Sequence, residues 1–246
     1  MSIQVKDKVA LVTGANRGIG RAIAESFLEH GAKKVYLAVR NPESTIELAQ
    51  KYGERVVTLQ VDVSNADSIA SLAQSAQDTQ IVVNNAGILR TADPLAENAE
   101  TALSEELEVN LYGLLRVANA FAPILEQQSD AALVQLNSVA SIKNFHPFST
   151  YSASKAAAYS ITQGLRESFA EKNVSVMSVH PGPIDTDMAS QAGFEASDSA
   201  SVVAEAIVNG LQEDQFLVFP DTMAKDFEAA YQSYAEALIK PLGLVE

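Results

Sequence analysis

The sequence predicts an α/β protein in which a doubly wound, seven-stranded parallel sheet is flanked by helices on both faces. Three observations favour this class. Short, valine-rich apolar runs recur along the 246 residues, segments with helical spacing of apolar residues alternate with them, and the connections are short. Such runs are typical of strands buried on both faces of a parallel sheet with right-handed helical crossovers. No repeat, linker or change of composition interrupts the pattern, so we predict a single domain over 1–246.

Composition excludes several functional classes. The chain has no cysteine, which rules out disulfides and cysteine-ligated metals, and its histidines lack ligand spacing, so we expect no metal site. Seventeen basic and 31 acidic residues give a net charge of −14, which should repel nucleic acids and anionic membranes. No apolar run approaches the roughly 20 residues of a transmembrane helix. The N-terminus does not resemble a signal peptide, and we expect a cytoplasmic protein.

The first strand is predicted at 8–13, followed by a glycine-rich turn and a helix over 21–30. This order points backbone N–H groups and a helix N-terminus at a phosphate. The spacing, G-x3-G-x-G, differs from the general dinucleotide fingerprint, and glycines also simply permit tight turns. The candidate phosphate site consists of Gly14, Asn16, Arg17, Gly18, Ile19 and Gly20.

The second strand, predicted at 34–39, ends at Arg40. In dinucleotide-binding folds an acidic residue near this point binds the ribose 2′-hydroxyl, whereas an arginine accommodates a 2′-phosphate. No acidic residue directly follows this strand, and Arg17 is a second cation within reach of the same phosphate. The two guanidinium groups favour NADP(H) over NAD(H). The alternative is that both arginines are only solvated.

The following elements alternate in the same way. We predict helices at 43–52 and 65–76, the latter with Ser64 as its N-cap, and strands at 55–61 and 81–84. Ligands of such sheets bind at the carboxyl ends of the strands. The residues that fall there are Gly14, Arg40, Asp62 and Asn84.

A long helix is predicted over 102–127, with Asn110 among its inward-facing leucines. A buried asparagine needs hydrogen-bond partners, so Asn110 either braces the sheet or belongs to the site. The remaining elements are strands at 132–137, 174–179 and 216–219, helices at 151–172, 199–212 and 222–239, and a short insertion at 185–198 that contains Met188 and Phe194 and is a candidate lid.

A serine, a tyrosine and a lysine follow the fifth strand with a suggestive spacing. Ser138 ends the strand, Tyr151 comes 13 positions later, and Lys155 follows one helical turn after the tyrosine. A lysine ammonium beside a phenol lowers the tyrosine pKa from about 10, which gives an acid/base group usable near neutral pH. The alternatives are an exposed Tyr–Lys pair without a role, and Ser141 in place of Ser138.

Six motifs together carry a family resemblance. They are Thr13-Gly14-x3-Gly18-x-Gly20, Asn84-Asn85-Ala86-Gly87, Asn110, Ser138, Tyr151-x3-Lys155 and Pro181-Gly182. In these motifs, in this order and over essentially the whole chain, the sequence resembles the short-chain dehydrogenase/reductase (SDR) family. The resemblance implies a Rossmann-type domain that binds NADP(H), with a catalytic tetrad of Ser138, Tyr151, Lys155 and Asn110.

The resemblance also implies roles around the cofactor. Lys155, besides keeping Tyr151 acidic, bonds the nicotinamide ribose, and Asn110 holds a water that connects Lys155 to solvent. Asp62 and Val63 contact the adenine, and Asn84, Ala86 and Gly87 lie near the adenosine half. Pro181, Gly182, Ile184 and Thr186 hold the nicotinamide carboxamide. Family members usually form homodimers or homotetramers through two long helices, here 102–127 and 151–172.

We therefore expect an NADPH-dependent reductase of ketones or aldehydes, acting reversibly as an alcohol dehydrogenase on a small-molecule substrate, without nucleic-acid or membrane partners. Two alternatives stay open: a catalytically silent NADP(H)-binding sensor or scaffold, and a reductase of 3-oxoacyl groups on an acyl carrier protein, which needs a basic docking patch. His146 as a second acid is a further possibility. The predicted substrate pocket consists of Leu89, Asn144, Phe145, His146, Phe148, Met188 and Phe194.

Overall fold

The computed structural model describes residues 2–194 and 198–239. Within these residues it shows a seven-stranded sheet with the order β3-β2-β1-β4-β5-β6-β9, in which every pairing is parallel. The strand order reverses between β1 and β4, the point at which a doubly wound sheet opens a crevice for ligands. The predicted fold class is confirmed.

The strands lie where the valine-rich runs predicted them, with ends that differ by a residue or two. Residues of β1 pair with β4 through Leu11 and Val82, and both strands are completely buried because helices cover both faces of the sheet. The bounds are β1 Val9–Thr13, β2 Lys34–Val39, β3 Val56–Gln60, β4 Ile81–Asn84, β5 Ala131–Leu136, β6 Val174–Val179 and β9 Leu217–Val218.

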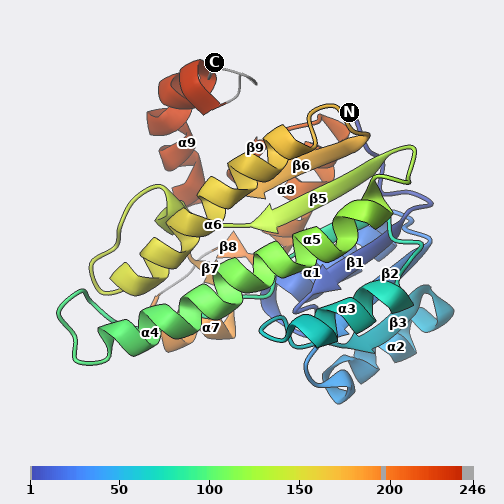
Figure 1. Ribbon diagram of the computed structural model, residues 1–246, viewed down its shortest axis with the longest axis horizontal. Coiled ribbons are helices and arrows are strands. Elements are labelled where there is room, and N and C mark those ends of the chain that lie inside the picture. Colours follow the sequence, from blue (N-terminus) through green and yellow to red (C-terminus); the bar gives the residue numbers. More distant parts are fainter. Residues whose placement is uncertain (1, 195–197, 240–246) are drawn as a thin grey trace.

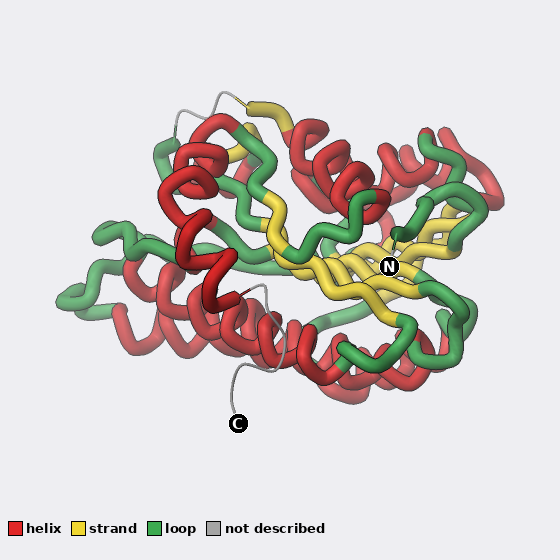
Figure 2. The backbone as a smooth tube through the Cα atoms, turned by 90° about the horizontal axis from the view of Figure 1, so that it is seen from above, coloured by secondary structure: helices red, strands yellow, loops and turns green. Residues whose placement is uncertain are grey.

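The helices form two layers with the strands between them (Figures 1 and 2). One layer contains α1 Gly18–Glu29, α2 Ile46–Tyr52, which continues the 3₁₀ turn Pro42–Thr45, and α8 Ala200–Gln212. The other contains α3 Ala66–Ser75, α4 Ala99–Glu106, α5 Leu114–Leu125 and α6 Ser149–Ser168. The last helix, α9 Thr222–Tyr234, extends beyond the end of the sheet and continues as the π-helical turn Ala235–Ile239.

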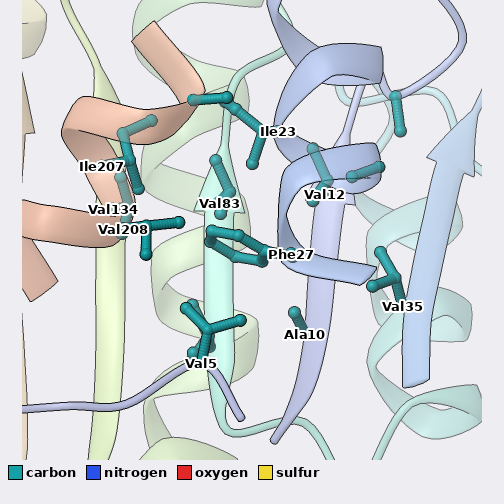
Figure 3. Packing of buried hydrophobic residues seen from close by; sticks show 14 of the residues in the cluster. Val5, Ala10, Val12, Ile23, Phe27, Val35, Val83, Val134, Ile207 and Val208 are labelled. Carbon is teal, nitrogen blue, oxygen red and sulfur yellow. The ribbon is translucent and has the colours of Figure 1, made fainter. Parts of the chain in front are cut away.

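The core beneath the first layer fixes α1 relative to the sheet. Phe27 of α1 is fully buried and lies between α8 and the central strands, beside Ile207, Val208 and Val83 (Figure 3). Burying a phenylalanine side chain contributes roughly 1.5–3 kcal/mol. The start of α1, which carries the glycine turn, is therefore held rigidly against the carboxyl ends of β1 and β4.

Two local predictions are wrong. Asn65, not Ser64, caps α3, because the Asn65 side chain accepts a bond from the Ser68 N–H at 3.0 Å whereas Ser64 donates to Asp62. The long helix over 102–127 is not continuous, since a π-helical segment, Leu107–Gly113, separates α4 from α5. Such segments are frequent at functional sites, and this one contains Asn110.

The insertion after β6 forms β7 Ile184–Asp185, the short helix α7 Asp187–Gln191 and β8 Asp198–Ser199, with β7 and β8 paired. Residues 195–197 of the predicted lid lie outside the described residues. No helix in the described part of the chain is both long and apolar enough to span a membrane.

Candidate active site

A cavity of about 560 Å³ lies at the carboxyl ends of the central strands. Its size is that of a small-molecule or cofactor site. It extends from the glycine turn, past the ends of β2 and β4, to the start of α6 and the insertion. The predicted site residues that line it are Gly14, Asn16, Arg17, Gly18, Ile19, Gly20, Arg40, Asp62, Val63, Ala86, Gly87, Ser138, Tyr151, Lys155, Pro181, Gly182, Ile184 and Thr186.

The glycine turn needs its glycines for two different reasons. Gly14 and Gly18 have φ angles of +67° and +51°, in the left-handed region that side chains rarely adopt. A Cβ on Gly20 would lie 2.3 Å from the Gly14 carbonyl oxygen, so the first turn of α1 can approach the loop only without a side chain there. The result is a close cradle at a helix N-terminus, which is suited to an anion.

Arg17 and Arg40 lie at the outer end of the cavity, and both are exposed. The Arg17 guanidinium pairs with the Asp187 carboxylate of α7 at 3.0 Å. Next to Arg40, two hydrogen bonds from Ser64 hold the pKa of Asp62 below its usual value, and the Arg40 charge adds to this effect. The outer end thus has two cations and two carboxylates.

Ser138 and Tyr151 meet at the inner end of the cavity. The Ser138 hydroxyl donates to the Pro181 carbonyl at 3.2 Å, accepts from the Ala140 N–H at 3.1 Å, and lies near enough to the Tyr151 phenol to oppose the increase of the tyrosine pKa. The rival, Ser141, does not line the cavity, and its hydroxyl instead contacts the Ser138 carbonyl and His180. Of the two serines, Ser138 is therefore the one beside the tyrosine.

Lys155 lies on the same side of α6 as Tyr151, with its ammonium 5.8 Å from the centre of the tyrosine ring. The ammonium donates to the Leu136 carbonyl at 2.8 Å, and burial lowers the pKa of Lys155 to about 8. Burial raises the pKa of Tyr151 to about 12, against the Ser138 hydrogen bond, and the charge of Glu106 adds to the increase. The expectation of a tyrosine pKa below 10 is wrong for this structure, because the desolvation of the buried phenol exceeds the favourable effect of Ser138.

Asn110 braces the loop after β4 against α6. Its side-chain oxygen accepts from the Ile88 N–H at 2.8 Å, and its amide donates to the Ile88 carbonyl and the Ser154 hydroxyl, each at 2.9 Å. A Cβ on Gly87 would lie 3.2 Å from that oxygen and 3.7 Å from the Lys155 ammonium. Asn110 itself does not line the cavity, and the water predicted beside it stays a prediction.

Asn84, which was predicted near the adenosine half of the cofactor, also lies outside the cavity lining. Its side chain turns into the core and donates to the Leu114 carbonyl at 3.1 Å. The next residue, Asn85, lines the cavity instead and donates to the Thr13 carbonyl at 2.8 Å. Alternate residues of a strand point to opposite faces, and the exact exit of the chain from β4 decides which asparagine faces the ligand.

Aromatic and aliphatic side chains form the wall opposite the glycine turn. Phe148 and Phe194 pack with ring centres 5.0 Å apart, and Leu89, Phe145 and Met188 complete the predicted wall. Two predicted pocket residues, Asn144 and His146, do not line the cavity: the Asn144 oxygen accepts from the Ser149 hydroxyl at 3.1 Å and the His146 side chain is exposed.

Two residues at the start of the last helix, its N-cap Asp221 and Met223, lie at the site although the sequence did not predict them there. Met223 lines the cavity, and Asp221 links the helix to the Pro181-Gly182 turn, because its carboxylate accepts from the N–H groups of Gly182 at 2.7 Å and Ala224 at 3.1 Å. An aspartate before a helical segment indicates an N-cap. Nothing in the sequence indicates that this helix reaches the site.

No group of three or more His, Asp or Glu side chains within the described residues could hold a metal ion.

Comparison with known proteins agrees with this geometry. The family model for short chain dehydrogenases matches residues 8–196, which include the glycine turn and the serine, tyrosine and lysine. The chain belongs to the short-chain dehydrogenase family of oxidoreductases.

Relatives and solved structures cover nearly the whole chain. An uncharacterized oxidoreductase of Staphylococcus aureus (strain MW2) is 34% identical over 216 residues, which is 84% of this chain and 92% of the relative. A short chain dehydrogenase from Burkholderia cenocepacia J2315, solved in complex with NADP, is 33% identical with a TM-score of 0.87 and covers 97% of this chain and 100% of that chain. A relative from Burkholderia phymatum, solved with NAD, has a TM-score of 0.85 at 23% identity over 99% of each chain and supports the fold alone.

Proposed function

We propose that this protein is an NADPH-dependent reductase of ketones and aldehydes that also catalyses the reverse oxidation of alcohols. One observation carries the proposal: Ser138, Tyr151 and Lys155 meet at the inner end of a cavity whose outer end holds a glycine cradle and two arginines. The residues fit a dinucleotide, because the backbone approaches too closely at Gly20 for any side chain and the start of α1 suits a phosphate.

The roles of the protein groups follow from their positions. The nicotinamide, when bound, supplies the hydride. The Ser138 hydroxyl can exchange its long bond to the Pro181 carbonyl for the substrate oxygen, where negative charge develops. Tyr151 donates the proton: with its pKa raised to about 12, the phenol carries a proton at neutral pH. The Lys155 ammonium stabilises the phenolate that remains.

We propose that the substrate is neutral and largely apolar near its carbonyl group. The wall around Ser138 and Tyr151 consists of Leu89, Phe145, Phe148, Met188, Phe194 and Met223. This wall carries no charged side chain, so a carboxylate there would be desolvated without a partner.

The Tyr151→Phe variant tests the proposed function. General acid/base transfer contributes about 10²–10⁴-fold to the rate, so we expect kcat to fall by at least about 10²-fold in this variant. NADPH should still bind with unchanged affinity. Wild-type protein, Tyr151→Phe and the control Tyr112→Phe, an exposed tyrosine, are assayed for NADPH consumption over aldehydes, ketones and 3-oxoacyl thioesters. Near-native turnover in Tyr151→Phe contradicts the assignment. Wild-type protein that binds NADPH and turns over nothing supports the silent sensor.

The preference for NADPH has a separate test. Arg17, Arg40 and the NADP complex of the Burkholderia cenocepacia relative support it. A hydrogen bond to a charged group contributes about 1.5–3 kcal/mol, so Arg40→Asp should lower kcat/KM for NADPH by about 10–100-fold relative to NADH. Lys172→Asp makes the same charge change away from the cavity and should leave this ratio unchanged. An unaltered ratio in Arg40→Asp would exclude 2′-phosphate recognition by this residue.

A further inference from the structure

His180 is a fully buried histidine directly beneath the proposed catalytic serine, and it has no role in the mechanism above. Its Nδ1 lies 2.9 Å from the Ser141 hydroxyl and 3.2 Å from the Ser138 carbonyl oxygen, and its Nε2 lies 2.7 Å from the Ser178 hydroxyl. The ring stacks on Phe219 and meets the edge of Tyr159, with ring centres 5.1 and 4.6 Å apart. Every side of the imidazole is therefore engaged.

The hydrogen bonds around His180 assign its tautomer. The Asn137 amide donates to the Ser178 oxygen at 2.8 Å, so the Ser178 proton is free to go to Nε2. Nδ1 then carries the ring proton and donates toward Ser141 and the Ser138 carbonyl. The opposite tautomer would set the Nδ1 lone pair against that carbonyl oxygen. Burial lowers the pKa of His180 to about 4, so the ring is neutral at ordinary pH and the chain of hydrogen bonds runs in one direction.

This chain ends on the main chain of Ser138. The Ser138 carbonyl accepts from the Ser141 N–H at 2.9 Å, from the Ser141 hydroxyl and from His180. Three donors on one carbonyl fix the peptide group that follows Ser138. The Ser138 side chain branches from the same backbone, and its hydroxyl accepts from the Ala140 N–H and donates to the Pro181 carbonyl. A fixed main chain at Ser138 therefore keeps this hydroxyl at the inner end of the cavity.

We propose that His180 is a positioning residue that acts through Ser141 to hold the Ser138 hydroxyl in its reactive place. This inference rests on the proposed function. An aromatic ring without nitrogen atoms could fill the space between Tyr159 and Phe219, whereas a buried polar network is favourable only when each member is satisfied. Misplacing a reacting group by about 1 Å can lower the rate by about 10²-fold. A network that prevents such a displacement of the Ser138 hydroxyl therefore preserves the rate of the proposed reaction.

Four variants test this role by kinetics. Ser141→Ala removes the link to Ser138. His180→Asn keeps a donor near the position of Nδ1, whereas His180→Gln keeps a polar group near Nε2 only. Ser178→Ala removes the donor to Nε2, while the Ser138 carbonyl still keeps the ring proton on Nδ1. This variant is therefore the matched control for lost stability. We expect kcat to fall about 10–100-fold in Ser141→Ala and His180→Gln with KM for NADPH unchanged, and to stay within about threefold of wild type in His180→Asn and Ser178→Ala.

Thermal unfolding of all four variants separates positioning from folding. A kcat that instead follows the loss of stability across the series, or His180→Asn as slow as His180→Gln, overturns the proposal.

A second readout does not depend on turnover. In protein labelled with ¹³C at the tyrosine ζ carbon, the Tyr151 resonance is identified by its loss in Tyr151→Phe. We expect Ser141→Ala to shift this resonance, because the Ser138 contact to the phenol loosens, and Ser178→Ala to leave it in place. Wild-type protein that reduces no carbonyl compound contradicts the proposed function alone, and an unshifted Tyr151 resonance in Ser141→Ala overturns the positioning role.

Discussion

At the scale of single residues, the surroundings of Lys155 destabilise the charged form of its side chain. Burial lowers its pKa to about 8 from an ordinary 10.5, and the Leu136 carbonyl is the hydrogen-bond partner that the structure gives its ammonium. A buried cation destabilises the folded state. The ammonium nevertheless lies 5.8 Å from the centre of the Tyr151 ring, where its charge would stabilise a phenolate. If Tyr151 is the proton donor, as proposed, the ammonium is already in place when the phenol loses its proton, and no reorganisation is needed.

This burial predicts a pH dependence of stability. Below pH 8 the folded and unfolded chains both hold the Lys155 proton, and the folded state bears the full desolvation cost. Between pH 8 and 10.5 the unfolded chain keeps a proton that the folded chain releases, so stability rises with pH in this window. Relative to Lys155→Met, the wild-type free energy of unfolding should therefore increase by up to about 3 kcal/mol between pH 7 and 10.5.

Urea unfolding of the wild type and of Lys155→Met at pH 7, 8.5 and 10 measures the difference between their free energies of unfolding. The titration of all other groups contributes equally to both proteins and cancels in this difference. Lys172→Met, in which a half-exposed lysine is removed, should show no such trend. A constant difference between wild type and Lys155→Met across these pH values would mean that Lys155 keeps an ordinary pKa.

Spacing alone could predict which residues of this site meet, but not their electrostatics. Ser138, Tyr151 and Lys155 follow from local rules, namely the end of a strand and one turn of a helix. The direction of the shift in the Tyr151 pKa could not be predicted from local rules, because it depends on how completely segments distant in the sequence bury the phenol. His180 was also beyond prediction, because its partners come from four separate places: the turn after β5, the strand β6, the helix α6 and the residue that follows β9.

Among the elements, the short helix α7 contacts the glycine turn through the ion pair between Arg17 and Asp187. Both side chains are mostly exposed, and such pairs contribute about 0.2–1 kcal/mol. Arg17 is also one of the two cations proposed for the 2′-phosphate. If Arg17 binds the 2′-phosphate, as proposed, Asp187 competes with the cofactor for the same guanidinium group.

Asp187→Asn should release Arg17 and lower KM for NADPH by about two- to fivefold, because the competing pair contributes at most about 1 kcal/mol. KM for NADH, which lacks the 2′-phosphate, should not change. Asp185→Asn is the matched control, since this carboxylate lies nearby and does not line the cavity. Equal changes for both cofactors would indicate a general effect of charge rather than release of Arg17.

Elements were predictable where one local pattern determines them and not where tertiary packing does. The buried strands follow from valine-rich runs between turn residues. The π-helical segment at Leu107–Gly113 could not be predicted in this way, because the spacing of apolar residues is the same in this segment as in the α-helices on either side. The segment places Asn110 against Ile88 and Ser154. Met223 reaches the cavity only because α9 begins at the end of the sheet that carries the site.

At the scale of the whole molecule, the sheet gathers groups that are distant in sequence. The turn after β1, the ends of β2 and β4, and the serine after β5 all lie at one edge because every strand runs in the same direction. That topology was predictable from the alternation of strands and helices. The shape of the substrate wall was not, since it depends on loops and on α9 closing over that edge.

The outer surface of α6 leads to a prediction about assembly. Ala153, Ala156 and Ser160 are exposed on this helix, which packs against α4 and the π-helical segment Leu107–Gly113. Small side chains allow another helix to approach closely. We expect a homodimer or homotetramer that uses this surface. In a two-fold interface a new carboxylate meets its own copy, so Ala156→Glu should shift the protein toward monomers. Ser201→Glu, on α8 in the opposite layer, should not. Sedimentation velocity over a range of concentrations measures both, and a monomeric wild type or an unchanged Ala156→Glu assembly would exclude this interface.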